Sequence, residues 1–162
     1  MIQQTLVLLK PDAVQRGFTG KIIERFENVG LKIVAMKMVK IDTAQAEKHY
    51  FDIAQRHGKK VLDSLVGYIT QGPVIAMILE GVNAVENVRK MVGSTYPNEA
   101  TPGTIRGDYS HISKQYANDN NKVISNLIHA SAKPKEAEYE IKLWFKTEEI
   151  YDYKITDEMH VM

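Results

Sequence analysis

Two stretches of the sequence are apolar at every position, and they constrain the fold more than any other feature. They are Leu6–Leu9 and Val74–Leu79. A strand with one face in water alternates apolar and polar residues, so an unbroken apolar run predicts a strand covered on both faces. Both runs are far shorter than the roughly 20 apolar residues that span a bilayer. We therefore expect a folded domain built around a central sheet.

The rest of the sequence alternates between helix and strand patterns. Further strands are predicted over residues 31–41 and 123–129, and helices over residues 19–29, 43–54, 60–69, 84–92 and 134–145. Asn83 and Glu86 predict a variant of the capping box. Residues 94–122 are predicted to form a long irregular loop, and residues 146–162 a polar and aromatic tail. With the extra helix pair set aside, this order predicts an α+β fold of the ferredoxin-like, split βαβ type, with a four-stranded antiparallel sheet and helices on one face.

The charge balance limits the partners of the chain. Lys and Arg number 21 and Asp and Glu 20, which gives a formal net charge of +1. Such a chain has no strong field to hold nucleic acid or an anionic membrane, so an anion site must be a local cluster of basic groups. The absence of cysteine excludes disulfides and fits the reducing cytoplasm. The apolar start lacks the basic leader of a signal peptide. We expect one cytoplasmic domain over residues 1–162.

Four ionisable residues lie at the margins of apolar segments. Lys10 ends the first strand, and His129 ends the last one. Arg89 and Glu140 lie beside the apolar stripes of their helices, at helical spacing. Each residue alone has an ordinary interpretation, in which it extends to solvent or pairs with a neighbour. Together they predict a shared cleft.

The long loop adds a segment that could clamp a phosphate. In Thr104–Asp108, Arg106 offers a bidentate guanidinium and Gly107 allows close approach of a backbone. The structural alternative is a surface loop with an Arg106–Asp108 pair that contributes at most about 1 kcal/mol. The sequence contains no Walker loop, no G-x-G-x-x-G after a strand and no H-E-x-x-H. Any phosphate chemistry must therefore use other groups.

The segment Asn126–Ser131 resembles the active-site strand of nucleoside diphosphate kinases, in which the histidine is phosphorylated. Other motifs match in order: Lys10-Pro11-Asp12, Gln15-Arg16-Gly17, His49-Tyr50, Gly72-Pro73-Val74, Arg89 with Gly93 and Thr95, Pro102-Gly103-Thr104-Ile105-Arg106-Gly107-Asp108, and Glu140. The similarity covers the chain up to about residue 153. It implies transfer of the terminal phosphate from a nucleoside triphosphate to a nucleoside diphosphate. It also implies a homo-oligomer, either a hexamer or a tetramer.

The resemblance further implies a role for each site residue. His129 carries the phosphate, Glu140 orients it and Ser131 supports them. The nucleotide and its phosphates are held by Lys10, Tyr50, Arg89, Thr95, Arg106 and Asn126. Mg²⁺ arrives with the nucleotide and bridges its phosphates, so no metal site on the protein is expected. A histidine with a pKa near 6.5 is largely neutral at pH 7, and a covalent intermediate predicts ping-pong kinetics.

The sequence departs from the family at three places. Val61 stands where the family has a phenylalanine that stacks on the base, after a short insertion around residues 55–60. Residues 109–125 hold roughly ten residues more than the family's usual length, which loop entropy tolerates. Ala132 replaces an acidic residue. Two alternatives to the enzyme stay open: a nucleotide-binding regulator without turnover, and a protein that relays phosphate from its histidine to a partner protein.

Overall fold

The computed structural model describes residues 1–161 and contains one four-stranded sheet. Its strands are β1 (Ile2–Leu9), β2 (Lys32–Val39), β3 (Val74–Val82) and β4 (Ile128–Ala130). Their order in the sheet is β2-β3-β1-β4, and every neighbouring pair is antiparallel. This is the ferredoxin-like order, because β1 and β3 lie at the centre and each half of the chain adds one edge strand. The predicted α+β fold with a four-stranded antiparallel sheet is confirmed.

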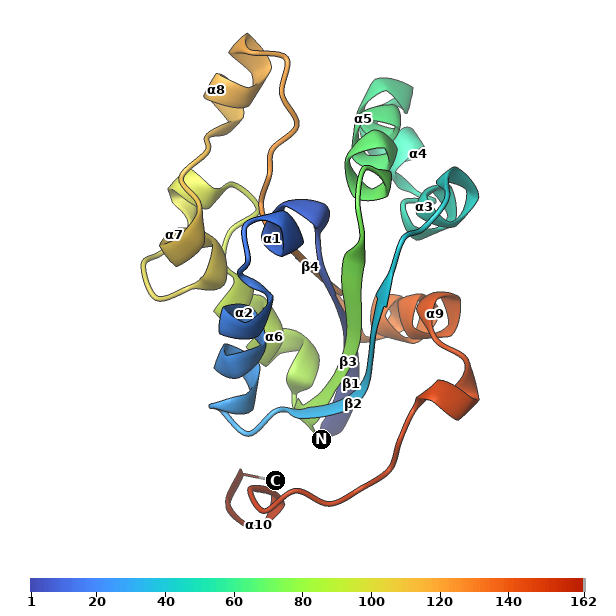
Figure 1. Cartoon of the computed structure of the whole chain (residues 1–162), viewed down its shortest axis with the longest axis vertical. Helices are drawn as coiled ribbons and strands as arrows, with labels where there is room; N and C mark the ends of the chain where they lie inside the picture. The colour runs from blue at the N-terminus through green and yellow to red at the C-terminus, as the bar shows by residue number, and fades with distance from the viewer. Residues whose placement is uncertain (162) are drawn as a thin grey trace.

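The helices account for most of the remaining chain (Figure 1). They are α1 (Pro11–Gln15), α2 (Thr19–Glu27), α3 (Thr43–His49), α4 (Ile53–His57), α5 (Lys59–Thr70), α6 (Ala84–Val92), α7 (Ile105–Tyr109), α8 (Lys114–Asp119), α9 (Pro134–Trp144) and α10 (Glu158–Val161), with 3-10 turns η1 (Pro97–Glu99) and η2 (Thr147–Glu149). The predicted helices are found, apart from shifts at their ends and a break after His49. Tyr50 caps α3 there, and α4 starts after Asp52.

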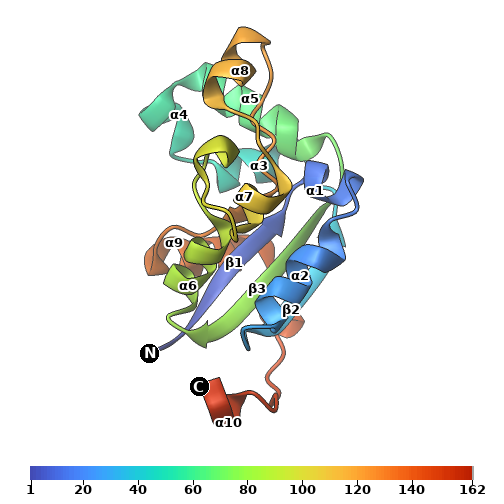
Figure 2. The same ribbon diagram turned by 90° about the vertical axis from the view of Figure 1, so that its left-hand side faces the viewer.

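Helices cover both faces of the sheet. The crossover helices α2 and α6 share one face, where Phe26 and Val88 pack against Val7 and Met77 (Figure 2). On the other face, α3, α5 and α9 form a second core around Leu6, Leu8, Ala76 and Ile78. The prediction of helices on one face is therefore right for α2 and α6 and wrong for the others. The cause lies in the unbroken apolar runs of β1 and β3, which present apolar side chains to both sides.

Three local predictions were wrong. The segment before β4 is not wholly irregular, because it contains η1, α7 and α8. The last strand is only three residues long, Ile128–Ala130, since residue 127 has a positive φ that interrupts extended backbone. Asn83 does not cap α6 with its side chain; it takes a left-handed conformation, φ 47°. Gly93 does end α6, at φ 86°.

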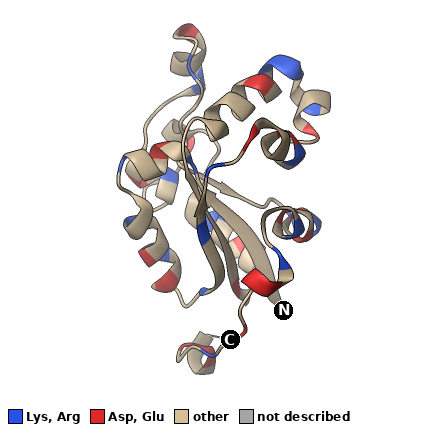
Figure 3. Cartoon of the chain, turned by 45° about the vertical axis from the view of Figure 1, so that its right-hand side comes forward, with Lys and Arg blue, Asp and Glu red and all other residues tan. Residues whose placement is uncertain are grey.

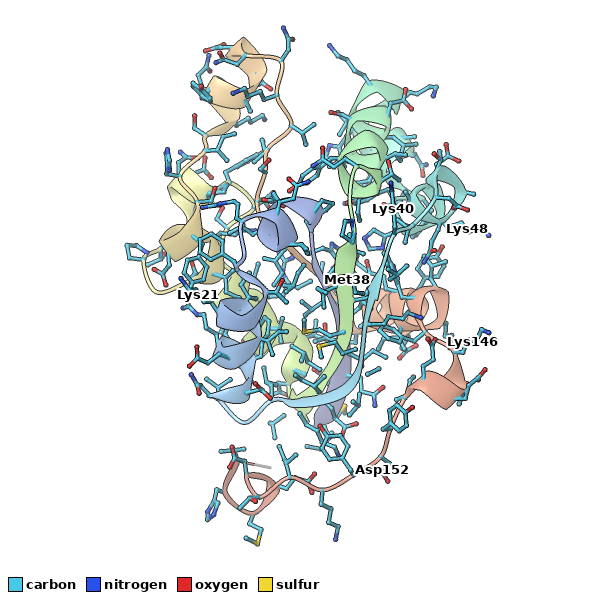
Figure 4. The ribbon with its side chains drawn as sticks, in the orientation of Figure 1. Lys21, Met38, Lys40, Lys48, Lys146 and Asp152 are labelled. Atoms are coloured by element: carbon cyan, nitrogen blue, oxygen red, sulfur yellow. The ribbon has the colours of Figure 1, made fainter. Side chains whose placement is uncertain are left out.

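The tail folds back along the edge strand β2. The Tyr151 amide donates to the Val34 carbonyl at 2.8 Å, and the Tyr153 hydroxyl donates to the Ile33 carbonyl at 2.7 Å. Lys32, 4% exposed, lies 3.3 Å from a Glu158 oxygen and 3.6 Å from an oxygen of Asp152, which is labelled in Figure 4. Charges of both signs are interspersed along the ribbon (Figure 3). No helix of residues 1–161 is long and apolar enough to cross a membrane.

Candidate active site

His129 lies in the middle of β4, and a carboxylate holds its ring. The ring nitrogen Nε2 is 2.7 Å from Oε1 of Glu140, and Oε2 of Glu140 accepts a hydrogen bond from the Ser131 hydroxyl at 2.5 Å. Glu140 is 2% exposed, whereas the His129 side chain keeps 19% exposure. Because Glu140 accepts with both oxygens, Nε2 carries the ring proton and Nδ1 keeps its lone pair. The half-buried ring is therefore held in one tautomer, with an unprotonated Nδ1.

The fold brings these three groups together from two elements. β4 pairs with the buried strand β1, with His129 opposite Leu8. Pro134 begins α9, a position where its fixed φ suits the first turn of a helix. Ala137, Glu140 and Trp144 form the buried stripe of that helix. A carboxylate in an apolar stripe is costly unless it is paired, and Glu140 is paired with His129 and Ser131.

Cationic and polar side chains lie next to the strand that carries His129. The Lys10 ammonium donates to Oδ1 of Asn126 at 2.7 Å, and Nδ2 of Asn126 donates to the Thr95 carbonyl at 2.9 Å. Arg89 reaches β4 from α6, where Nη1 donates to the Ala130 carbonyl at 3.4 Å. The strand that carries His129 is therefore flanked by a lysine and an arginine.

Burial and positive charge set the protonation of this cluster. Burial, helped by the neighbouring Arg106, lowers the pKa of Lys10 to about 7. Burial and the charge of Lys10 lower the pKa of His129 to about 3, and Arg106 and Arg89 add to this effect. Burial raises the pKa of Glu140. A neutral imidazole beside cationic groups suits attack on an anionic phosphorus centre, because it needs no prior loss of a proton.

Comparison with known proteins identifies the family. The family model described as nucleoside diphosphate kinase matches residues 3–150. The chain belongs to the nucleoside diphosphate kinase family. It is 48% identical over 160 residues to the nucleoside diphosphate kinase of Borreliella burgdorferi, covering 98% of this chain and 96% of that one. It is 53% identical over 152 residues to the enzyme of Pyrococcus furiosus, covering 94% of this chain and 88% of that one.

Solved structures of nucleoside diphosphate kinases share the whole fold. The Borrelia burgdorferi enzyme, solved as a transition-state mimic with vanadate and ADP, has a TM-score of 0.95 at 48% identity and covers 99% of this chain and 96% of its own. The Halobacterium salinarum enzyme in complex with CDP has a TM-score of 0.85 at 40% identity, covering 98% and 97%. The sequence-based identification as a nucleoside diphosphate kinase, and with it as a phosphotransferase, is confirmed.

Arg106 of this kinase is placed differently from the simple clamp that the sequence suggested. It is 5% exposed, and its guanidinium donates to four backbone carbonyls: Asn126 at 3.1 Å, Gly93 at 3.1 Å, Ser94 at 3.1 Å and Ile128 at 2.6 Å. A guanidinium has five N–H groups, so one remains for a phosphate. Arg106 therefore fixes the backbone on either side of Leu127, and its phosphate contact stays a prediction.

The neighbours of Arg106 also differ from expectation. Asp108 pairs with Arg25 at 2.6 Å and not with Arg106. Gly107 is needed for close approach of protein backbone: a Cβ there would lie 2.3 Å from the Thr101 carbonyl oxygen. The Arg106–Asp108 pair of the structural alternative thus does not form, and Gly107 serves the internal packing of the loop.

Tyr50 and Val61 were also assigned to the nucleotide, and the Tyr50 ring packs on that of His49 with the centroids 4.7 Å apart. Tyr50 is 7% exposed at the end of α3, and its hydroxyl has no hydrogen-bond partner among residues 1–161. Burial raises its pKa. Val61 lies on α5 with 41% of its surface exposed. The inserted loop forms α8, whose Tyr116 is 52% exposed.

His49 was recognised in the sequence as part of a motif and was not assigned to the site. It is buried with its ring 4.5 Å from the His129 ring, nearly perpendicular to it, and its Nδ1 accepts from the Trp144 indole at 3.2 Å. Helical spacing could have found it, because His49 lies three residues after Ala46 and both are buried on α3. His49, His129 and Glu140 offer ligand atoms within 4.8 Å of one another. The cations around His129 nevertheless favour an anion over a metal ion.

Proposed function

We propose that this kinase transfers phosphate through His129, with the residues around it in the roles that the sequence predicted. In the first half-reaction, Nδ1 attacks the terminal phosphorus of a nucleoside triphosphate, the bond to the bridging oxygen breaks, and the nucleoside diphosphate leaves. In the second, a terminal oxygen of another nucleoside diphosphate attacks the phosphohistidine and regenerates the imidazole. The observation that carries this proposal is the 2.7 Å contact of Nε2 with Glu140, which leaves Nδ1 as the reactive nitrogen.

Each half-reaction needs stabilisation of charge. The imidazole becomes cationic when it is phosphorylated, and Glu140 on Nε2 stabilises that charge. The phosphoryl oxygens carry negative charge, which Lys10, Arg89 and the remaining N–H of Arg106 stabilise. Thr95, Asn126 and Tyr50 also bind the nucleotide, and Val61 contacts the base. The packing of the Tyr50 ring on His49, with the centroids 4.7 Å apart, supports its assignment to the site.

Mg²⁺ is proposed to enter with the nucleotide. Among residues 1–161 the buried carboxylates are Asp12 and Glu140, and each already accepts hydrogen bonds with both oxygens. Because these oxygens are already occupied, the ion is proposed to be held by phosphate oxygens and water. Mg²⁺ commonly keeps several waters and binds through few protein carboxylates. When bound, the ion neutralises charge on the phosphates.

We also propose a cytoplasmic homo-oligomer. Met36 and Met38 on β2 are 54% and 60% exposed, and β2 is an edge strand (Met38 is labelled in Figure 4). Exposed methionines on an edge strand suit contact with another copy. Light scattering after gel filtration should give the mass of a hexamer or a tetramer, and a mass of 18.4 kDa would contradict the proposal. The absence of cysteine supports the cytoplasm.

Sequential labelling tests the mechanism against its two alternatives. The protein is incubated with ATP labelled in the γ-phosphate, freed of nucleotide and then given GDP. Labelled GTP is the expected product. A labelled protein that does not discharge to GDP would instead indicate a relay to a protein partner, and an unlabelled protein would indicate a binder. His129→Ala should abolish labelling, while the matched variant His111→Ala, in the inserted loop, should label normally.

A further inference from the structure

The residue two positions before His129 is held in a costly backbone conformation. Leu127 is fully buried with φ +69°, and the Ile128 amide donates to the Asn126 carbonyl at 2.8 Å. A hydrogen bond between residues i and i+2 around a positive φ is a γ-turn of the rare, strained kind. Such strain persists only where the surroundings over-determine the conformation, and it clusters at functional sites. This turn lies between Asn126, which holds Lys10, and His129.

The three carbonyls and the central amide of the turn are held by groups outside it. The Leu127 carbonyl accepts from the Lys10 amide at 2.8 Å, and Arg106 binds the carbonyls of Asn126 and Ile128. The Leu127 amide donates to Oδ2 of Asp12 at 3.0 Å. Asp12 is therefore the group that satisfies the one donor at the centre of the turn.

The carboxylate of Asp12 is itself fixed by a tyrosine. Its other oxygen, Oδ1, accepts a hydrogen bond from the Tyr68 hydroxyl, and the two residues are 7% and 4% exposed. Tyr68 comes from α5, and its ring also lies under the Lys10 ammonium, 5.3 Å from the centroid. One buried carboxylate thus connects α5, α1 and the strand of the candidate nucleophile.

Helix capping does not account for these contacts. Asp12 lies in the first turn of α1, where a negative carboxylate interacts favourably with the positive end of the helix dipole. Its partners, however, are 56 and 115 positions away in the sequence. A carboxylate that only capped a five-residue helix would face its own amides and would not need Tyr68.

We infer that Asp12 and Tyr68 are positioning residues, which hold the γ-turn at Leu127 and thereby aim His129 and Asn126. Neither needs to touch the phosphate. The inference rests on the proposed function, in which His129 is the nucleophile. Since a misplacement of about 1 Å can cost on the order of 100-fold in rate, relaxation of the turn should slow phosphorylation more than it weakens nucleotide binding.

The test compares Tyr68→Phe and Asp12→Asn with two matched controls. Tyr139→Phe removes a hydroxyl that donates to the Lys48 carbonyl at 2.9 Å, and Asp42→Asn alters a carboxylate that accepts from the Gln45 amide at 2.8 Å. The full-length variants are labelled in a single turnover at saturating ATP. The ADP dissociation constant and the thermal midpoint are measured in parallel. We expect the labelling rate of Tyr68→Phe to fall roughly tenfold more than its ADP affinity, and that of Asp12→Asn further. The controls should label like the parent protein.

The outcomes separate this inference from the proposed function. If folded Tyr68→Phe is labelled at the parent rate, or if its rate and its affinity fall equally, the pair has no positioning role. Tyr68→Phe removes a single oxygen, so it decides the matter even if Asp12→Asn does not fold. If His129→Ala is labelled like the parent protein, the proposed function itself fails, whatever Tyr68→Phe does.

Discussion

Nε2 of His129 and Oε1 of Glu140 are 2.7 Å apart, and Glu140 comes from the buried stripe of α9. This distance fixes the tautomer of the ring, since a carboxylate accepts the Nε2 proton and leaves Nδ1 unprotonated. It also explains why a carboxylate occupies a position that packing alone would give to an apolar residue.

Glu140→Gln should slow labelling of His129 by about 100-fold or more, because the amide does not stabilise the imidazolium and can favour the wrong tautomer. Single-turnover labelling with ATP measures this rate. Glu138→Gln, on the exposed side of the same helix, is the control and should label normally. Equal rates for the two variants would contradict the role of Glu140.

ADP affinity should weaken as the pH rises through about 7, the pKa to which burial lowers Lys10. A bound phosphate raises that pKa, so above pH 7 binding takes up a proton and the affinity falls up to tenfold per pH unit. Calorimetry at pH 8 in buffers of different ionisation enthalpy would reveal the proton. Lys10→Arg stays charged and should lose this slope; an unchanged slope in that variant would assign the proton to another group.

Val61→Phe should tighten ADP binding, because base stacking on an aromatic ring contributes about 1–3 kcal/mol. Fluorescence or calorimetric titration measures the affinity. Val29→Phe, at a site that is 53% exposed in the turn between α2 and β2, controls for the added apolar surface. An unchanged affinity for Val61→Phe would show that Val61 does not contact the base.

Gly107→Ala should lower the free energy of unfolding by about 1–3 kcal/mol, as overpacking does. The new Cβ would lie 2.3 Å from the Thr101 carbonyl oxygen. Gly67→Ala is the matched change: it lies within α5 and its Cβ would meet nothing within 4 Å. Alanine is the better helix former there, so this variant should be more stable by about 0.5–1 kcal/mol. Urea unfolding compares the two, and equal stabilities would refute the packing argument.

Hydrophobic pattern predicted most of the fold. The unbroken runs in β1 and β3 indicated central strands, and glycine ended α2 and α6 as expected. The hydrophobic pattern could not predict that β4 has only three residues, because the start of this strand depends on the γ-turn at Leu127. Leucine has no intrinsic preference for a positive φ, so only the contacts around it decide the conformation.

Some residues of the candidate site could be predicted from the sequence, whereas others could not. Lys10, Arg89, His129 and Glu140 were conspicuous in the sequence because each is an ionisable residue beside an apolar stripe. Arg106 was noticed, but its four backbone partners were not, since carbonyls carry no signature in sequence. His49 and Asp12 were seen only as parts of motifs.

The sequence by itself determined which residue types are available and which strands are buried, because solvation and backbone preference act locally. Tertiary structure alone decided which groups meet: Glu140 with His129, Arg106 with the backbone around Leu127, and Tyr68 with Asp12. These contacts join residues as many as 56 positions apart, and hydrogen bonds depend on distances of a few tenths of an ångström. Such distances are set by the packing of α5 and α9 on the sheet, which no local pattern encodes.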